Sequence, residues 1–534
     1  MTEQVMSRAT APVAARPTLL LVYRLIGIVV PLVAVIVLIS QRPVSFDGAM
    51  NMQVAQSLAD GGEYARSYRQ ELFPSDIQTS SYFLLIAAAA IRIFGATTLA
   101  FQASNIVFVA ILLSAVSLVL PESRLAALLL PGTVLVATPG LLGYSMGGYG
   151  EGAVAALALC AFALLADAAV DKGHSTRSTV LAMACVGVAV SIKTVALAIL
   201  PVALAALAIV WYANGRRWRP LLLGIAAAAG PVVAFEVYRA ITLGNRYDDW
   251  WADQLTHVSL QATGQGLNEP SRPILAKIAH HFHILAVQTN VLAEWWLVLF
   301  LALPTALILT ILVARRAALL GTLARPLILI ACLTAYGLLY VGWWLAVTST
   351  EKAWLRRVTV GLFALLLAAI LLALLLAWML RRTPMLRRPR QVALLAPAII
   401  SVIALVAVAV PSVAANKRTA QAQTQLESVT ELSSEVTALA DAGAEFYGIG
   451  WWSAPVISLY ADVDVSNLGE VDYCEQDVLE VVEAGDAYII WDFYAINLGS
   501  PEPIAYREVR YEETGIANQS GTLWRMTVPA GACD

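Results

Sequence analysis

The chain has 534 residues, of which 59% are hydrophobic and only 13% are charged. A soluble globular protein usually has about 45–50% apolar and about 25% charged residues, and one as apolar as this chain would expose large hydrophobic patches. The composition therefore excludes an ordinary soluble protein and predicts a polytopic α-helical membrane protein in contact with the lipid bilayer. Because no basic patch with interleaved aromatic residues occurs, we expect no nucleic-acid partner.

The net charge of −3 conceals an uneven distribution along the chain. From Ala415 onward the sequence holds 20 acidic and 5 basic residues, so the preceding part is basic. Such asymmetry indicates two regions that lie in different compartments. We therefore divide the chain into a transmembrane module, residues 1–414, and a soluble domain, residues 415–534.

The transmembrane module contains apolar runs of about 20 residues, the length that a helix needs to cross a bilayer. The first run, Leu19 to Ser40, is too long for a signal-peptide core and has no clear cleavage site, which favours a retained signal anchor. Ten later runs bring the expected number of spans to about eleven: 99–120, 124–142, 152–170, 178–192, 194–212, 220–243, 287–314, 326–347, 358–380 and 391–413.

Two segments decide the topology of these spans. The stretch from Ser80 to Phe94 is apolar but short and contains Arg92, so we expect a helix that lies in the membrane interface. Counting it as a span would reverse the side of every later loop. The stretch 178–212 is too long for one span and has basic residues on both flanks, so we expect two spans that meet near Ser191–Thr194.

Lysine and arginine in short loops mark the cytoplasmic side of a membrane protein. They gather in alternate loops, which contain Lys172 and Arg177; Arg216, Arg217 and Arg219; Arg315, Arg316 and Arg325; and Arg381, Arg382, Arg387, Arg388 and Arg390. We therefore expect a multi-pass protein of the bacterial inner (plasma) membrane with a cytoplasmic N-terminus. Loops 41–98, 143–150, 244–286 and 347–357 and the C-terminal domain would then be periplasmic or extracellular.

The C-terminal domain has the sequence pattern of a small α/β fold. Apolar residues recur at helical spacing from Leu426 to Leu439, and Gly443 is a suitable helix end. A further helical stretch is expected at Asp477–Glu483. The strand-like runs are Glu445–Ile449, Ala487–Trp491, Ile504–Tyr511 and Thr522–Val528.

Two of the five cysteines, Cys474 and Cys533, lie in this domain. Outside the cytosol such a pair favours a disulfide, which over this spacing would stabilise the domain by about 4 kcal/mol in the chain-entropy model. The other three cysteines lie in apolar runs and are expected to be core residues.

Two acidic residues are the strongest candidates for chemistry, because charge near membrane depth is costly and usually functional. Asp47 follows the first span and begins an amphipathic helix, where it could also cap the helix N-terminus. Glu151 follows the glycine-rich turn 147–150, where its alternative role is to interact with a helix dipole. The expected topology places both acids on the same side at similar depth, which neither alternative role explains.

Four basic residues on the outer side are candidates for binding an anion. Lys193 lies between two apolar runs, where it could also snorkel to the interface. Lys352, Arg356 and Arg357 precede the tenth span, against the trend that places positive charge in the cytoplasm. A lipid phosphate is a suitable partner, because arginine binds phosphate bidentately and lysine binds it as a point charge.

Weaker candidates lie near the same side. Glu236 and Glu294, at the outer ends of spans seven and eight, either bind sugar hydroxyls or simply face the cavity. Trp451 and Trp452 either stack on a sugar or attach the C-terminal domain to the membrane part. The loop 244–286 contains His280, His281 and His283, which leave a divalent metal open as a cofactor, although surface histidines are the simpler interpretation.

In this order, the motifs resemble the type C glycosyltransferase (GT-C) superfamily, most closely its protein O-mannosyltransferases and lipid A aminoarabinose transferases. The likeness extends over about residues 1–415, and the order and shared side of the motifs carry it. The motifs are the first span, Asp47 with Gly61-Gly62, Arg92-Ile93-Phe94-Gly95, Gly148-Tyr149-Gly150-Glu151, Lys193, and Trp354-Leu355-Arg356-Arg357.

The resemblance implies a GT-C-like fold in which Asp47 is the catalytic acid/base residue and Glu151 is the second outer-loop acid. Lys193 and Arg356 or Arg357 would bind the polyprenyl-phosphate leaving group. The sequence departs from the mannosyltransferases at Gly48, where they usually carry a second acid. It departs from the aminoarabinose transferases at residues 79–81, which are Thr-Ser-Ser rather than Lys-Pro-Pro.

These features predict an inverting glycosyltransferase that uses a polyprenyl-phosphate sugar, with mannose or arabinofuranose as the first candidates for the sugar. The acceptor would be a cell-envelope glycan, a lipid-linked glycan or a protein. A lipid-phosphate donor fits because nucleotide sugars are not expected outside the cytoplasm and the sequence has no Walker-type phosphate loop. Its phosphate is a good leaving group, so one general base is sufficient.

Two other functional classes remain open at the level of sequence. A transporter or flippase for a lipid-linked sugar would have the same spans and cations, but it would be expected to contain inverted repeats, and none is evident. A sensor with an outer binding domain accounts for the C-terminal domain but gives Asp47, Glu151 and Lys193 no role.

Overall fold

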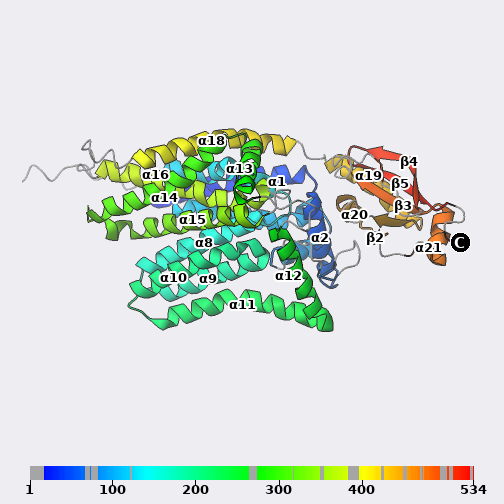
Figure 1. Cartoon of the computed structure of the whole chain (residues 1–534), viewed down its shortest axis with the longest axis horizontal. Helices are drawn as coiled ribbons and strands as arrows, with labels where there is room; N and C mark the ends of the chain where they lie inside the picture. Colours follow the sequence, from blue (N-terminus) through cyan, green and yellow to red (C-terminus); the bar gives the residue numbers. More distant parts are fainter. Residues whose placement is uncertain are drawn as a thin grey trace, which may run out of the picture.

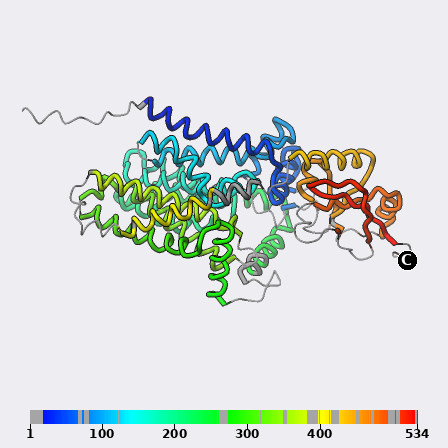
Figure 2. The backbone as a smooth tube through the Cα atoms, turned by 90° about the horizontal axis from the view of Figure 1, so that it is seen from above, coloured from blue at the N-terminus to red at the C-terminus, as the bar shows by residue number. Residues whose placement is uncertain are grey.

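The protein is a helical bundle that carries a small α/β domain at one end, as the computed structural model in Figure 1 shows. It describes residues 17–65, 72–73, 82–120, 123–263, 273–316, 318–348, 354–382, 396–421, 426–448, 454–468, 472, 474–492, 502–503, 509–529 and 533. Seen from above in Figure 2, the α/β domain lies beyond the same end of the bundle as the blue helix α2.

The bundle is built from helices that match the apolar runs of the sequence. They are α1 (Pro17–Ser40), α2 (Phe46–Ala59), α3 (Tyr82–Phe94), α4 (Thr98–Phe101), α5 (Ala103–Val119), α6 (Arg124–Ala137), α7 (Leu141–Tyr144), α8 (Glu151–Val170), α9 (Ser175–Ile192), α10 (Ile199–Ala213), α11 (Trp218–Leu243), α12 (Tyr247–Thr263), α13 (Ile274–Thr289), α14 (Ala293–Arg316), α15 (Leu320–Val347), α16 (Thr359–Arg382) and α18 (Ala396–Gln421).

Among the described residues, eight helices are long and apolar enough to cross a membrane, and four shorter apolar helices accompany them. The runs that were expected to span the membrane are largely helical in their described parts, with breaks at 138–140 and 290–292, and the stretch that was expected to lie in the interface forms the short helix α3. The two spans expected to meet near Ser191–Thr194 do separate there, because α9 ends at Ile192 and a 3-10 helix, Thr194–Ala198, follows. The protein is therefore an integral membrane protein.

The centre of the bundle is formed by α8 and α16, the two most buried of the described candidate spans. Both begin at the end of the bundle near α2, and both begin beside charged residues. Glu151 is the first residue of α8, and Arg356 and Arg357 lie in the 3-10 turn Leu355–Arg357 just before α16. By contrast, α11 lies at the edge and packs on α9.

Helix α2 differs from its expected character. The sequence predicted an amphipathic helix with a polar face, whereas the structure buries residues on all sides from Gly48 to Ala55, including the polar Asn51 and Gln53. The helix begins where Ser45 caps it by accepting a hydrogen bond from the Gly48 amide, at 3.1 Å. Its polar residues are covered by other protein elements rather than by water, as described below.

The C-terminal domain is a five-stranded sheet with helices on both faces. The strand order is β2-β1-β3-β5-β4, with parallel pairing of β1 to β2 and β3 and antiparallel pairing elsewhere. The elements are α19 (Leu426–Asp441), β1 (Glu445–Gly448), α20 (Pro455–Ala461), β2 (Ser466–Asn467), α21 (Gln476–Ala484), β3 (Ala487–Asp492), β4 (Arg510–Asn518) and β5 (Gly521–Thr527). One core contains α19 and α20, and the other contains α21.

Most of these elements were expected, with three differences. The sequence pattern missed α20 and β2, which have seven and two residues. Strand β4 extends to Asn518, well beyond the predicted end at Tyr511, while residues 504–508 of the predicted run lie outside the described residues. The helix α18 continues to Gln421, so the expected boundary between residues 414 and 415 falls inside it.

A disulfide joins Cys474, just before α21, to Cys533 near the C-terminus, with the Cα atoms 5.5 Å apart. The bond ties the chain end to the face of the sheet that α21 covers. We predict that Cys474→Ser with Cys533→Ser lowers the free energy of unfolding of this domain by about 4 kcal/mol. The measurement is the urea midpoint for proteolysis of the domain, with reduced wild type as the matched control. Equal midpoints for the oxidised wild type and the variant would contradict the prediction.

Candidate active site

The first element of the site is a close contact between α2 and the glycine turn that precedes α8. The Ser45 hydroxyl donates to the Gly147 carbonyl at 2.5 Å, and the Asn51 amide donates to the Gly148 carbonyl at 2.8 Å. A Cβ atom on Gly48 would lie 1.8 Å from the Gly147 carbonyl oxygen, so no side chain fits at residue 48. This contact gives a physical reason for the glycine that replaces the second acid of the mannosyltransferases.

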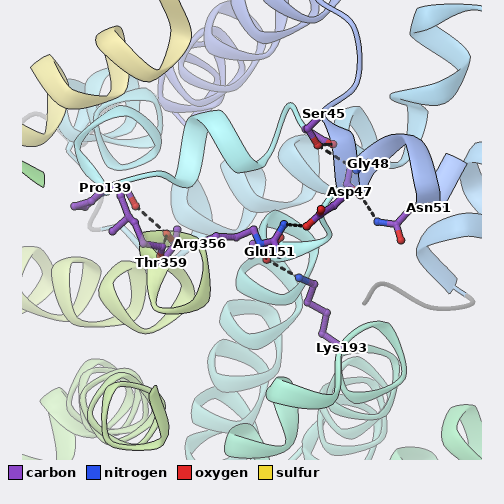
Figure 3. Close-up of polar contacts among 12 residues, drawn as sticks. Ser45, Asp47, Gly48, Asn51, Pro139, Glu151, Lys193, Arg356 and Thr359 are labelled. Carbon is purple, nitrogen blue, oxygen red and sulfur yellow. Dashed lines mark hydrogen bonds and ion pairs between the residues drawn. The ribbon is translucent and has the colours of Figure 1, made fainter. Parts of the chain in front are cut away.

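Asp47, in the first turn of α2, forms an ion pair with Arg356 (Figure 3). The Asp47 side chain retains 27% of its exposure, whereas Arg356 is buried. The guanidinium of Arg356 also lies 4.5 Å from the centre of the Tyr149 ring, and its Nε atom is 3.8 Å from Glu151 Oε1. A single arginine therefore contacts both of the acids that the sequence identified.

Glu151 and Lys193 form the most buried ion pair of the site. Lys193 Nζ lies 2.5 Å from Glu151 Oε1, and the two residues are 7% and 3% exposed. The second carboxylate oxygen of Glu151, Oε2, is buried and has no hydrogen-bond partner among the described residues. An acceptor atom in this position is suited to accept a hydrogen bond from a hydroxyl group of a ligand.

Arg357 contributes a cation that forms no direct ion pair with an acidic side chain of the described residues, although the charges of Asp47 and Glu151 act on it from a distance. Its Nε atom is buried and has no hydrogen-bond partner among those residues, and its guanidinium lies 5.9 Å from the Trp354 ring centre. Burial, and next the positive charge of Arg356, lower the pKa of Arg357 to about 10. The group therefore stays protonated at neutral pH.

The backbone around both arginines is fixed from two sides. The Leu355 amide donates to Gln288 Oε1 of α13 at 2.6 Å, and the Thr359 hydroxyl donates to the Pro139 carbonyl at 3.1 Å. Neither Gln288 nor Thr359 was identified from the sequence, because a polar residue at the end of an apolar run does not indicate which residue it will hydrogen-bond. These two hydrogen bonds position the turn that carries Arg356 and Arg357, and the guanidinium groups take no part in them.

The charges of this cluster do not cancel. Among the described residues, Asp47 and Glu151 contribute two negative charges, and Lys193, Arg356 and Arg357 contribute three positive charges, which leaves one positive charge in excess. Since buried charges are usually paired, the excess marks a place where an anion would be stabilised. A phosphate diester or monoester has both the charge and the acceptor oxygens that lysine and arginine bind.

The other candidates of the sequence analysis lie apart from this cluster or outside the described residues. Glu236 forms an ion pair with Arg239 at 2.6 Å and accepts a hydrogen bond from Tyr247 at 3.1 Å, so both of its oxygens have partners. Glu294 is exposed in the first turn of α14. Lys352, Trp451 and Trp452 lie outside the described residues.

The cluster around Glu236 has its own structural role, which the sequence analysis missed. Arg239 is buried with its guanidinium 3.9 Å from the Trp250 ring centre and 4.7 Å from that of Phe235, a cation–π arrangement. The Trp250 indole donates to the Phe73 carbonyl at 2.8 Å, which attaches the segment between α2 and α3 to α12. A signal was present, because Glu236 and Arg239 have the i,i+3 spacing of a helical ion pair.

The three histidines do not form a metal site with one another. His281 is buried, with Nδ1 2.9 Å from the Lys277 carbonyl oxygen, while His283 is exposed. Within the described ranges, no group of three or more His, Cys, Asp or Glu residues has the arrangement of a metal site.

No protein-family model matches the sequence, and no curated protein matches it. The fold, however, is similar to that of ArnT from Cupriavidus metallidurans bound to undecaprenyl phosphate, with a TM-score of 0.55 over 96% of this chain and 98% of that chain at 11% sequence identity. The apo state of the same ArnT gives a TM-score of 0.54 over 94% and 97% of the two chains at 12% identity. The chain therefore shares the overall fold of ArnT, in agreement with the fold that its motifs predicted.

We predict that Lys193→Met alone destabilises the protein by about 3 kcal/mol, because it leaves the Glu151 carboxylate buried without its nearest cation. Adding Glu151→Gln should restore most of this loss, since the pair then contains no charge. Thermal unfolding in detergent of the two single variants and the double variant measures the coupling. Additive losses in the double variant would contradict the ion pair.

Proposed function

We propose that the protein is an inverting glycosyltransferase of the bacterial inner membrane, which transfers a sugar from a polyprenyl-phosphate donor to a cell-envelope acceptor at the outer face. The observation that carries this proposal is the cluster of three cations and two acids, in which Arg357 Nε is buried and has no protein partner among the described residues. The likeness in fold to ArnT, solved with undecaprenyl phosphate, supports a lipid phosphate as the anion.

In the proposed reaction, Asp47 acts as the general base. It takes the proton of the acceptor hydroxyl while that oxygen attacks the anomeric carbon, and the bond from this carbon to the phosphate oxygen breaks. The displaced polyprenyl phosphate keeps the electron pair, and its negative charge is stabilised by Lys193, Arg356 and Arg357. A single displacement of this kind inverts the configuration at the anomeric carbon.

The partial exposure of Asp47 and the burial of Lys193 and Arg356 agree with these different roles. Asp47 has to meet an acceptor that arrives from the outer side, and its side chain is more exposed than those of Glu151, Lys193 and Arg356. The unpartnered Oε2 atom of Glu151 is a candidate acceptor for a sugar hydroxyl. Mannose and arabinofuranose are the first sugars to test, with a glycan, a lipid-linked glycan or a protein as acceptor.

We predict that Asp47→Asn lowers the turnover number about 10³-fold, because an amide cannot accept the proton. Transfer of labelled sugar from synthetic polyprenyl-phosphate mannose or arabinofuranose to membrane acceptors measures the effect. Asp60→Asn is a matched control, because Asp60 is exposed directly after the last residue of the same helix. Equal turnover of Asp47→Asn and wild type would exclude Asp47 as the base, and lipid flipping without sugar transfer would favour a flippase.

We predict that Arg357→Gln weakens binding of polyprenyl phosphate about 10–100-fold, the range for a lost hydrogen bond to a charged group. The expected sign follows from the excess charge, since the variant leaves two cations against two acids. Titration with undecaprenyl phosphate in detergent gives the dissociation constant directly. Arg316→Gln removes an exposed arginine in the last turn of α14 and should leave affinity unchanged. Equal affinities of Arg357→Gln and wild type would remove Arg357 from the phosphate site.

A further inference from the structure

Helix α2 is held on two opposite faces, and only one of them belongs to the membrane module. Gln56 lies nine residues after Asp47, about two and a half helical turns, and therefore on the opposite side of the helix. Its amide donates to Asp462 Oδ1 of the C-terminal domain at 2.5 Å. The Gln53 amide, 3% exposed, lies 3.2 Å from Ser458 Oγ and 3.4 Å from the Pro455 carbonyl oxygen.

The element that makes these contacts is α20, a helix of seven residues that belongs to two cores at once. Ile457 and Ala461 lie in the core of the C-terminal domain, whereas Leu459 lies in the core of the membrane module. A helix this short has little stability of its own, so burial on both sides fixes its position. In Figure 1, α20 lies on the side of the α/β domain that faces α2.

Tyr460 extends this contact beyond α2. Its ring packs edge-on against Phe101 with the ring centres 5.6 Å apart, and its hydroxyl donates to Thr98 Oγ1 at 3.4 Å. The ring thus attaches α20 to α4, which packs on α3, a neighbour of α2. Gln53 and Gln56 of α2 contact the C-terminal domain directly.

We propose that α20 is a positioning element for the reaction, and that Gln53 and Tyr460 are positioning residues which set the place of Asp47 through α2. The proposal rests on the function proposed above for Asp47. Because α2 lies between the Gly147–Gly148 turn and α20, release of the second face lets the helix move as a unit. A displacement of about 1 Å of a reacting group can lower a rate about 10²-fold, whereas Lys193, Arg356 and Arg357 lie on other elements and keep their places.

The experiment uses the full-length protein with Gln53→Met and Tyr460→Ala combined. Methionine keeps the volume of Gln53 but removes its contacts with Pro455 and Ser458, and alanine removes the Tyr460 ring. We expect kcat to fall about 10–100-fold while KM for the lipid-phosphate donor changes less than about twofold. A second double variant carries Tyr460→Phe in place of Tyr460→Ala. Phenylalanine keeps the ring, so this variant should regain most of the turnover.

A second readout separates this proposal from the proposed function. Hydrogen exchange of the amides in 46–59 should be faster in the double variant, while exchange in 175–192 should be unchanged. Leu439→Ala is the control for simple loss of domain stability, because Leu439 packs on the core of the C-terminal domain from α19. It should leave kcat and exchange in α2 as in wild type.

The outcomes are distinct. Unchanged exchange in α2, or a loss of kcat matched by a rise in donor KM, would overturn the positioning role of α20. The same loss with Leu439→Ala would also overturn it, because the effect would then be one of stability. Absence of transfer by wild type from every polyprenyl-phosphate sugar would overturn the proposed function, and the exchange result would still test the contact itself.

Discussion

The burial of Glu151 is the constraint on which the rest of the site depends. Removing a carboxylate from water costs several kcal/mol unless cations and hydrogen bonds replace the water. Lys193 and Arg356 provide this compensation, and each reaches Glu151 from a break in regular structure, one between α9 and α10 and the other just before α16. Three segments of the bundle therefore have to end at the same depth, and their ends define the cluster.

Arg356 then links the two acids, because it contacts Asp47 and Glu151 with different atoms of one guanidinium. The arginine side chain is rigid and planar at this group, so the spacing of the two acids is set by covalent geometry as well as by packing. Arg357 follows in the same turn and has no acidic partner within the described part of the chain. The excess positive charge thus arises because the two adjacent arginines and Lys193 are matched by only two acids, Asp47 and Glu151.

The sequence predicted helices and strands, whose pattern of apolar residues is local, and missed contacts between residues that are far apart in the chain. The lengths of the apolar runs indicated the helices of the bundle, and strand-like runs indicated β1, β3 and β5, because these patterns are local in the sequence. The pair of Asp47 and Arg356, 309 residues apart, leaves no local pattern. The amphipathic pattern after Asp47 predicted a polar face of α2. A sequence gives the polarity of a residue and not what covers it, and in the structure α20 covers the polar Gln53.

The glycine at residue 48 connects these observations. A second acid at this position would prevent the approach of the Gly147 carbonyl, and with it the hydrogen bonds that join Ser45 and Asn51 to the turn. That turn leads directly into Glu151, the first residue of α8. The small residue therefore allows a second carboxylate to come from another segment of the chain. It reaches the same guanidinium as Asp47 but is more buried and is paired with Lys193, and Asp47 remains the more exposed of the two acids.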